Sequence, residues 1–176
     1  VKITHGCTTL KTGQAAGIFS NGKLNIVLED GAELNIEMKN YARDRELTTQ
    51  QEKSYPISGQ CFGILNQGDL TIDAAEGCTT APQVNINVMG AGMTAGIRTV
   101  EFRDASSAVL EAGNLTIGAV DMDITVRGMS GPAFLNPQIV AQRQDGYGSV
   151  SGISSGDDII VNGVNAADGV AGTSLT

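Results

Sequence analysis

Apolar and polar residues alternate along this chain in a pattern that recurs at a nearly constant interval. Four segments each carry an aliphatic residue, a second aliphatic residue six positions later and a third one eight positions later. The residues that open these segments are Ile18, Ile64, Val109 and Ile153, at intervals of 46, 45 and 44 residues. This regularity predicts four repeats of about 45 residues, in which the four opening residues occupy equivalent core positions.

Each segment is typical of a short strand, a glycine-containing turn and a second strand whose alternate residues are apolar. The apolar pairs of the second strands are Leu24 and Ile26, Leu70 and Ile72, Leu115 and Ile117, and Ile159 and Val161. A third alternating strand is predicted at 32–38, 82–88 and 120–126, and the fourth repeat has no clear counterpart. We therefore expect an all-β protein.

The expected organisation is a single β domain over residues 1–176, with a polar excursion at 39–58. In a parallel β-helix each repeat would form one coil. In a β-sandwich, the alternative, the same strands would form hairpins, which the Asn21-Gly22 and Asn162-Gly163 pairs favour. A propeller would carry WD or kelch signatures, and none occurs. The even spacing favours the β-helix because a sandwich gives no reason for it. The excursion is interpreted as a solvated loop or as a recognition loop.

The segments GILNQGDLTI at 63–72 and GISSGDDIIVNG at 152–163 resemble the coil consensus of right-handed parallel β-helices of bacterial surface proteins. This family includes haemagglutinin-like adhesins and calcium-dependent carbohydrate-binding domains. The resemblance implies a secreted or cell-surface module, adhesin-like or scaffold, that binds carbohydrate or a surface protein without catalysis. A polysaccharide-active enzyme is the weaker alternative.

Composition and charge narrow the set of partners. The chain is 41% hydrophobic and only 4% aromatic, with 23 glycines, a net charge of −8 and an estimated pI of 4.5. An acidic protein repels phosphate backbones, so nucleic-acid binding is not expected. No apolar run reaches the roughly 20 residues that span a bilayer, so membrane insertion is not expected either. Because the chain begins at Val1, we interpret it as a processed or trimmed form.

Oxygen ligands are densest near the end of the chain, where Asp157, Asp158 and Asp168 lie close in sequence to Asn162 and Asn165. Hard carboxylate and amide oxygens are the ligands that calcium prefers, which makes the three aspartates calcium candidates. Their spacing matches neither an EF-hand nor a nonapeptide repeat. The same cluster is typical of acidic, solubilising turns. No other cofactor is expected.

The three cysteines are Cys7, Cys61 and Cys78, and none forms a CxxC pair that would indicate zinc. In an exported protein this number suggests one disulfide and one remaining thiol. Cys61–Cys78 closes the shortest loop and is the candidate disulfide. The alternative is that all three are buried as small apolar residues.

Catalytic motifs lack their structural context. Ser154 lies in a GxSxG match, but the following residues are typical of a strand and not of the helix that a nucleophile elbow needs. The glycine-rich stretch 90–95 also precedes a strand-like segment, whereas a dinucleotide site needs a helix. His5, the only histidine, lies near the N-terminus.

A compact mixture of acidic and basic residues occurs in 97–104. There Glu101 and Arg103 would share one strand face and Arg98 and Asp104 the other, which is typical of a polar outer face. The sequon that begins at Asn114 lies inside a predicted strand.

A second functional hypothesis is a structural subunit of an extracellular filament or spike. Residues 1–4 and 170–176 are strand-compatible, contain no proline and carry a single charge, on Lys2. Unguarded strand edges invite pairing with another chain, so we expect self-association through strand edges. Fraying of the termini is the competing interpretation.

Overall fold

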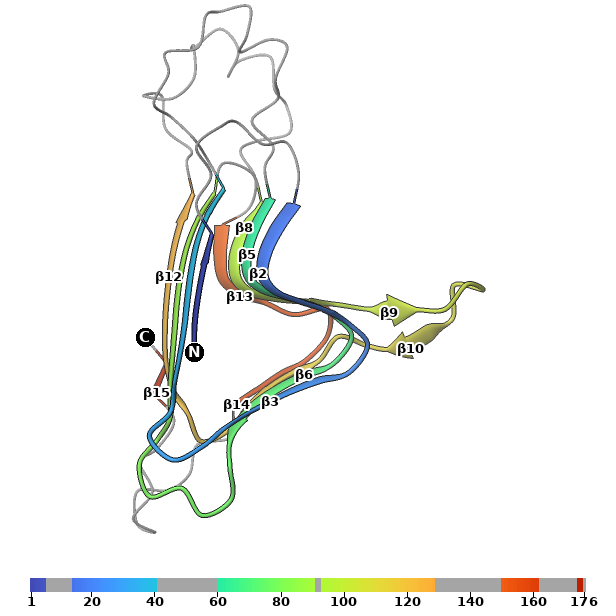
Figure 1. Ribbon diagram of the computed structural model, residues 1–176. Helices are drawn as coiled ribbons and strands as arrows, with labels where there is room; N and C mark the ends of the chain where they lie inside the picture. Colours follow the sequence, from blue (N-terminus) through green and yellow to red (C-terminus); the bar gives the residue numbers. More distant parts are fainter. Residues whose placement is uncertain (6–13, 41–59, 91–92, 129–149, 162–173, 176) are drawn as a thin grey trace, which may run out of the picture.

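The computed structural model describes residues 1–5, 14–40, 60–90, 93–128, 150–161 and 174–175, and this part of the chain consists of strands and turns without helix. The described residues form three parallel sheets and one two-stranded antiparallel hairpin (Figure 1). Sheet 1 contains, in spatial order, β1 (Lys2–His5), β4 (Glu33–Asn40), β7 (Gln83–Gly90), β12 (Asp121–Gly128) and β15 (Ser174–Leu175). The predicted all-β class is confirmed.

The other two parallel sheets contain four strands each. Sheet 2 contains β2 (Gln14–Asn21), β5 (Gln60–Gln67), β8 (Thr94–Val100) and β13 (Val150–Ser154). Sheet 3 contains β3 (Leu24–Leu28), β6 (Leu70–Ala74), β11 (Leu115–Ile117) and β14 (Ile159–Val161). The chain visits sheet 2, sheet 3 and sheet 1 in this order four times, so each repeat adds one strand to every sheet. In Figure 1 the three sheets lie as the sides of a triangle.

Equivalent residues of successive repeats lie side by side in columns that cross the strands. In sheet 3, Leu24, Leu70, Leu115 and Ile159 form one column, and Ile26, Ile72, Ile117 and Val161 form another. In sheet 1, residues 34, 36 and 38 continue into 84, 86 and 88 and then into 122, 124 and 126. Apart from Ile159 and Val161, which are about half exposed, these side chains form most of the core between the sheets. The predicted apolar positions of both strand sets are confirmed.

One of the four predicted equivalent residues is wrong. Ile18 pairs with Ile64 as predicted, but Ile64 pairs with Ile97, which in turn pairs with Ile153. Val109 instead belongs to an antiparallel hairpin of β9 (Phe102–Arg103) and β10 (Val109–Glu111) and is 47% exposed. The hairpin projects from the corner between sheets 2 and 3 (Figure 1). It is inserted where the other repeats turn within a few residues.

A glycine column explains how the strands of sheet 2 approach sheet 1. Gly17, Gly63, Gly96 and Gly152 follow one another in register. On one side of this column Phe62 belongs to a small separate apolar cluster, and on the other side Ile64 belongs to the main core. A Cβ atom on Gly17 would lie 2.7 Å from Cγ2 of Ile36 and 2.8 Å from the carbonyl oxygen of Gly63. The absence of a side chain therefore lets the isoleucine column of sheet 1 pack directly against the backbone of sheet 2.

Other sequence-based expectations are corrected. Asn21-Gly22 does not form a hairpin, because the turn leads from β2 of sheet 2 into β3, which pairs with β6 in sheet 3. Gly22 has a φ of 93° in this turn. Parallel pairing throughout the three sheets also argues against the hairpin-built sandwich. The fourth repeat does have a third strand, the short β15, which pairs with β12. The predicted polar excursion starts too early, because Lys39 belongs to β4, and residues 41–58 lie outside the described part.

Candidate binding face

The outward side of sheet 1 forms a continuous polar surface, which we call the polar face. Inward and outward residues alternate along each strand, as in the burial of Gln83–Gly90, where Val84, Ile86 and Val88 are at most 2% exposed. The polar outward residues of the face are Lys2, Thr4, Glu33, Asn35, Glu37, Lys39, Gln83, Asn85, Asn87, Asp121, Asp123, Thr125 and Arg127, and one apolar residue, Met89, lies between Lys39 and Arg127. Four carboxylates and three cationic groups are thus nearly balanced on it.

Parallel register aligns the side chains of the polar face in rows. One row runs through Lys2, Asn35, Asn85 and Asp123, and the next through Thr4, Glu37, Asn87 and Thr125. Neighbouring members of a row are about 4.8 Å apart, and rows on the same side of a strand are separated by about 6.6 Å. The face is therefore a regular grid of donors and acceptors.

Hydrogen bonds hold part of this grid in place. Nδ2 of Asn85 donates to Oδ1 of Asn35 at 2.8 Å, and Nδ2 of Asn35 donates to a carboxylate oxygen of Glu33 at 3.3 Å. The ammonium group of Lys39 lies 3.4 Å from the carboxylate of Glu37, but both side chains are about half exposed and such a pair contributes little stability. The fixed amides leave hydrogen-bonding capacity directed at solvent.

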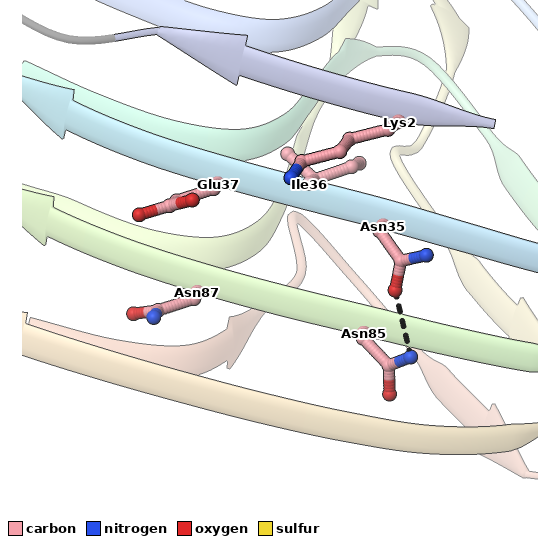
Figure 2. A pocket seen from close by; sticks show the side chains of 6 residues that line it. All are labelled: Lys2, Asn35, Ile36, Glu37, Asn85 and Asn87. Atoms are coloured by element: carbon pink, nitrogen blue, oxygen red, sulfur yellow. Dashed lines mark hydrogen bonds between the residues drawn. The ribbon is translucent and has the colours of Figure 1, made fainter.

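A shallow depression of about 260 Å³ opens on this grid (Figure 2). Its lining residues come from three adjacent strands and are Lys2, Asn35, Ile36, Glu37, Asn85 and Asn87. Figure 2 shows Asn85 directed along the row towards Asn35, with Glu37 and Asn87 further along the same strands. One ammonium, one carboxylate and three amides therefore surround the depression.

The predicted calcium candidates are only partly described. Asp157 and Asp158 lie in the turn between β13 and β14, whereas Asp168 lies outside the described residues. The Asp158 backbone takes part in the stack, since its N–H donates to Oδ1 of Asn114 at 3.1 Å and its carbonyl oxygen accepts from Leu115 N. Among the described residues no group of three or more metal-ligating side chains is brought together. Calcium binding stays a prediction.

The structure does not join the two cysteines of the candidate disulfide. Cys61 is buried near the start of β5, and Cys78 is buried in the turn after β6, where its sulfur lies 3.8 Å from the carbonyl oxygen of Leu28. One residue therefore lies within a strand of sheet 2 and the other beyond the end of a strand of sheet 3. Cys7 lies outside the described residues.

Residues of the candidate catalytic motifs are placed apart from one another. Ser154 ends β13 and is followed by a turn into β14, and the glycine-rich stretch from Gly90 leads from β7 into β8. His5 ends β1. Nη1 of Arg98 lies 2.7 Å from the sulfur of Met93. These residues are distributed over sheets 1 and 2 and do not line the depression.

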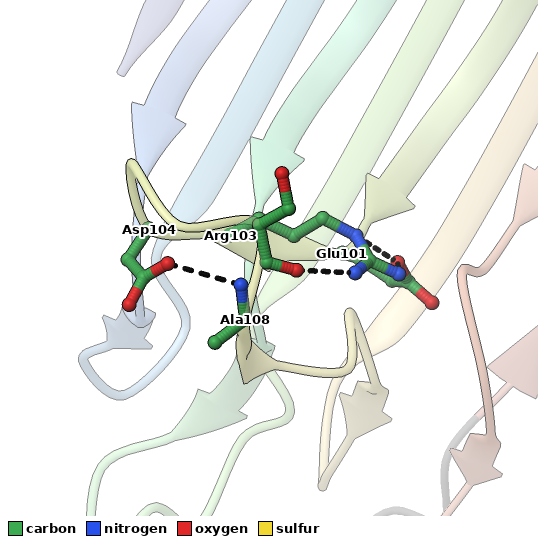
Figure 3. Close-up of polar contacts among 5 residues, drawn as sticks. Glu101, Arg103, Asp104 and Ala108 are labelled. Carbon is green, nitrogen blue, oxygen red and sulfur yellow. Dashed lines mark hydrogen bonds and ion pairs between the residues drawn. The ribbon is translucent and has the colours of Figure 1, made fainter.

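The charged residues of segment 101–104 form polar contacts within the β9–β10 hairpin (Figure 3). Arg103 pairs with the carboxylate of Glu101, as their predicted common face requires, and its Nη1 donates to the carbonyl oxygen of Ser107 at 2.7 Å. Oδ1 of Asp104 accepts from the hydroxyl and N–H of Ser106 and from the N–H of Ala108. The Ser106 hydroxyl, followed by the Ala108 N–H, lowers the pKa of Asp104 because both stabilise the carboxylate.

Asparagine and aspartate side chains at the corner between sheets 2 and 3 connect successive repeats. Asn66 is fully buried, and its Nδ2 donates to the carbonyl oxygens of Gly22, Gly68 and Asp69 at 2.9–3.0 Å. Asn114, the first residue of the sequon, is partly buried, and both its backbone N–H and its side-chain Nδ2 donate to Asp69 Oδ1, at 2.9 and 3.3 Å. This amide therefore has a structural partner in the stack.

The sequence reasoning missed the polar face, although the signal was present. The strands at 32–38, 82–88 and 120–126 were predicted from their inward residues alone. In each strand the central inward isoleucine is flanked by two polar residues that point outward. The three triplets are Asn35-Ile36-Glu37, Asn85-Ile86-Asn87 and Asp123-Ile124-Thr125. Once the repeats are placed in parallel register, these triplets predict the rows of the face.

No protein-family model matches this chain, and neither does any curated protein or any solved structure. The described part contains no helix that could cross a membrane.

Proposed function

We propose that this chain is a secreted or cell-surface module that binds a carbohydrate chain on its polar face, without catalysis. The observation that carries the proposal is the alignment of Lys2, Asn35, Glu37, Asn85 and Asn87 around one shallow depression. Amide groups both donate and accept hydrogen bonds, which suits the hydroxyl groups of sugars. A repeating polymer presents its hydroxyls at regular intervals, as the rows of the face do.

The near balance of charge on the face favours a neutral glycan over a polyanion. The protein as a whole carries a net charge of −8, and this acidity also disfavours nucleic acid and anionic membranes. The depression is smaller than the pockets that enclose small-molecule ligands, which occupy roughly 300 Å³ or more. A ligand that lies along the surface and contacts it with one or a few sugar units fits this shape better.

The scaffold that we propose for this face is a right-handed parallel β-helix. Its support is the repeated order of sheet 2, sheet 3 and sheet 1 along the chain, together with parallel pairing at each side. Stacked repeats of this kind hold long, flat faces rigidly, which is typical of scaffolds for extended ligands. A surface-protein ligand would use the same face.

A glycan array followed by calorimetry on the hits tests the proposal. We expect the Asn85→Ala, Asn87→Ala double variant to lose affinity at least tenfold, because two amides at the depression are removed. Asn25→Ala is the matched control, since Asn25 is an exposed amide on the outer side of sheet 3. No glycan bound by the unmodified chain, or an equal loss in the control, would contradict the proposal.

A further inference from the structure

The aliphatic side chains that are buried on the inner strands of sheet 3 are half exposed on its edge strand β14. Sheet 3 ends on one side with β3 and on the other with β14. Leu115 and Ile117 are 0% exposed, whereas Ile159 and Val161, which follow them in the same columns, are 49% and 46% exposed. Among the described strands, none covers the two β14 side chains in the way that β14 covers their equivalents in β11.

One backbone hydrogen bond recurs at every step of sheet 3. Leu24 N donates to the Asp69 carbonyl at 2.9 Å, Leu70 N to the Asn114 carbonyl at 2.8 Å, and Leu115 N to the Asp158 carbonyl at 2.9 Å. The next donor in this series is the N–H of Ile159, at the edge strand. Its acceptor in an added layer would be the carbonyl that precedes a leucine equivalent, and β3 offers the carbonyl of Lys23 before Leu24.

A second ladder of side-chain contacts runs beside the first. Oδ1 of Asp69 accepts from the N–H of Asn114 at 2.9 Å, and Oδ1 of Asn114 accepts from the N–H of Asp158 at 3.1 Å. The carboxylate of Asp158 is the next acceptor. In the same column the residue at the opposite end of the sheet is Lys23, whose ammonium group complements that carboxylate, and both residues are exposed.

The edges of sheet 1 complement each other as well. β15 pairs with β12 at Asp121 and Met122 only. At the other end of the sheet, β1 begins in the column of Asp123 and continues through that of Val126. β15 and β1 therefore cover successive columns at opposite ends of the sheet, so that β15 of one copy and β1 of another would fit end to end beside the same β12.

We infer that a second copy of this chain stacks head to tail on the β13–β14–β15 end, with its β3 beside β14 and its β1 beside β12. Asp158 then lies against Lys23 of the second copy, and Ile159 and Val161 against its Leu24 and Ile26. All three sheets continue by this single step. The contact is heterologous, so it propagates into a filament if repeated. It uses the edges of the sheets, so the outward side of sheet 1 is extended by the contact and not covered.

Charge reversal tests the contact. Sedimentation of the full chain over a range of concentrations is expected to show assembly that Asp158→Lys or Lys23→Asp weakens at least tenfold. The double variant Asp158→Lys, Lys23→Asp is expected to restore it, because the opposite charges face each other again. Asp157→Lys is the control, since it makes the same charge change one residue away from the column. Circular dichroism verifies that each variant is folded.

Cross-linking tests the direction of stacking. Ile160 and Asn25 share a column, so Ile160→Cys mixed with Asn25→Cys is expected to give a disulfide-linked dimer above the level of the unmodified chain. Either cysteine variant alone is expected to give no such increase. A chain that stays monomeric at all concentrations, a double variant that does not recover, or cross-linking within one variant alone would overturn the inference.

Discussion

β11 and β14 carry the same pattern of aliphatic residues in the same columns, yet one strand is buried and the other is half exposed. Leu115 is paired with Leu70 on one side and with Ile159 on the other, whereas Ile159 has a described partner strand on one side only. The sequence pattern therefore predicts which side chains of a strand point inward. The number of layers stacked on the strand decides how much stability that residue contributes.

The largest effect is expected where two layers meet at an aliphatic side chain. Leu115→Ala removes a side chain that is 0% exposed and leaves a cavity, so we expect a loss of about 3 kcal/mol in the free energy of unfolding. Ile159→Ala in the same column is expected to cost roughly 1 kcal/mol, because half of the side chain is already in contact with solvent. Urea denaturation at low protein concentration measures both. Equal losses would contradict the comparison.

An intermediate effect is expected in the glycine column. A Cβ at Gly63 would collide with Cγ2 of Ile86 and would lie 2.5 Å from the carbonyl oxygen of Gly96, so Gly63→Ala is expected to cost about 1–3 kcal/mol. At Gly152, in the last layer, nothing lies within 4 Å of the added atom. Gly152→Ala is therefore expected to leave stability unchanged or to raise it slightly. Thermal unfolding compares the stability of the two variants. A Gly152→Ala variant that is destabilised as much as Gly63→Ala would contradict this prediction.

The smallest effect is expected at the corner between sheets 3 and 1. Asp30 accepts hydrogen bonds from the N–H groups of Thr80 at 2.6 Å and Thr79 at 2.7 Å, and these bonds lower its pKa. The contribution of a group with a lowered pKa is present above its unfolded pKa and is lost as the pH falls through the folded pKa. Stability should thus decline slightly more below about pH 4 in the unmodified chain than in Asp30→Asn. Parallel declines would exclude this contact as a contributor.

The sequence alone predicted the strands whose spacing is constant, and it failed where an insertion imitates that spacing. Leu24, Leu70, Leu115 and Ile159 were placed correctly because each precedes a second apolar residue by two positions. Val109 was misplaced because it lies six residues before Leu115, as Ile18 does before Leu24. The hairpin separates the true equivalent, Ile97, from Leu115. Spacing counts residues and carries no information on whether a segment pairs with a neighbouring repeat or with itself.

Long-range register explains why the candidate site was harder to predict. The polar face depends on Asn35 and Asn85 being adjacent, although they are 50 residues apart in sequence. Short motifs such as the one around Ser154 involve neighbouring residues and are easy to recognise, but their context is missing here. A site that is made of one or two side chains from each repeat becomes visible only when the repeats are aligned laterally.

The inserted hairpin between β8 and β11 leaves the columns on both sides undisturbed. Ile97 is paired with Ile64 before the insertion, and Leu115 is paired with Leu70 after it, in the same registers that the uninterrupted repeats use. A corner of this stack is therefore a site where segments can be inserted or exchanged while the strand register of the three sheets is kept. Diversification at corners and preservation along the sheets can then proceed independently in the evolution of such a chain.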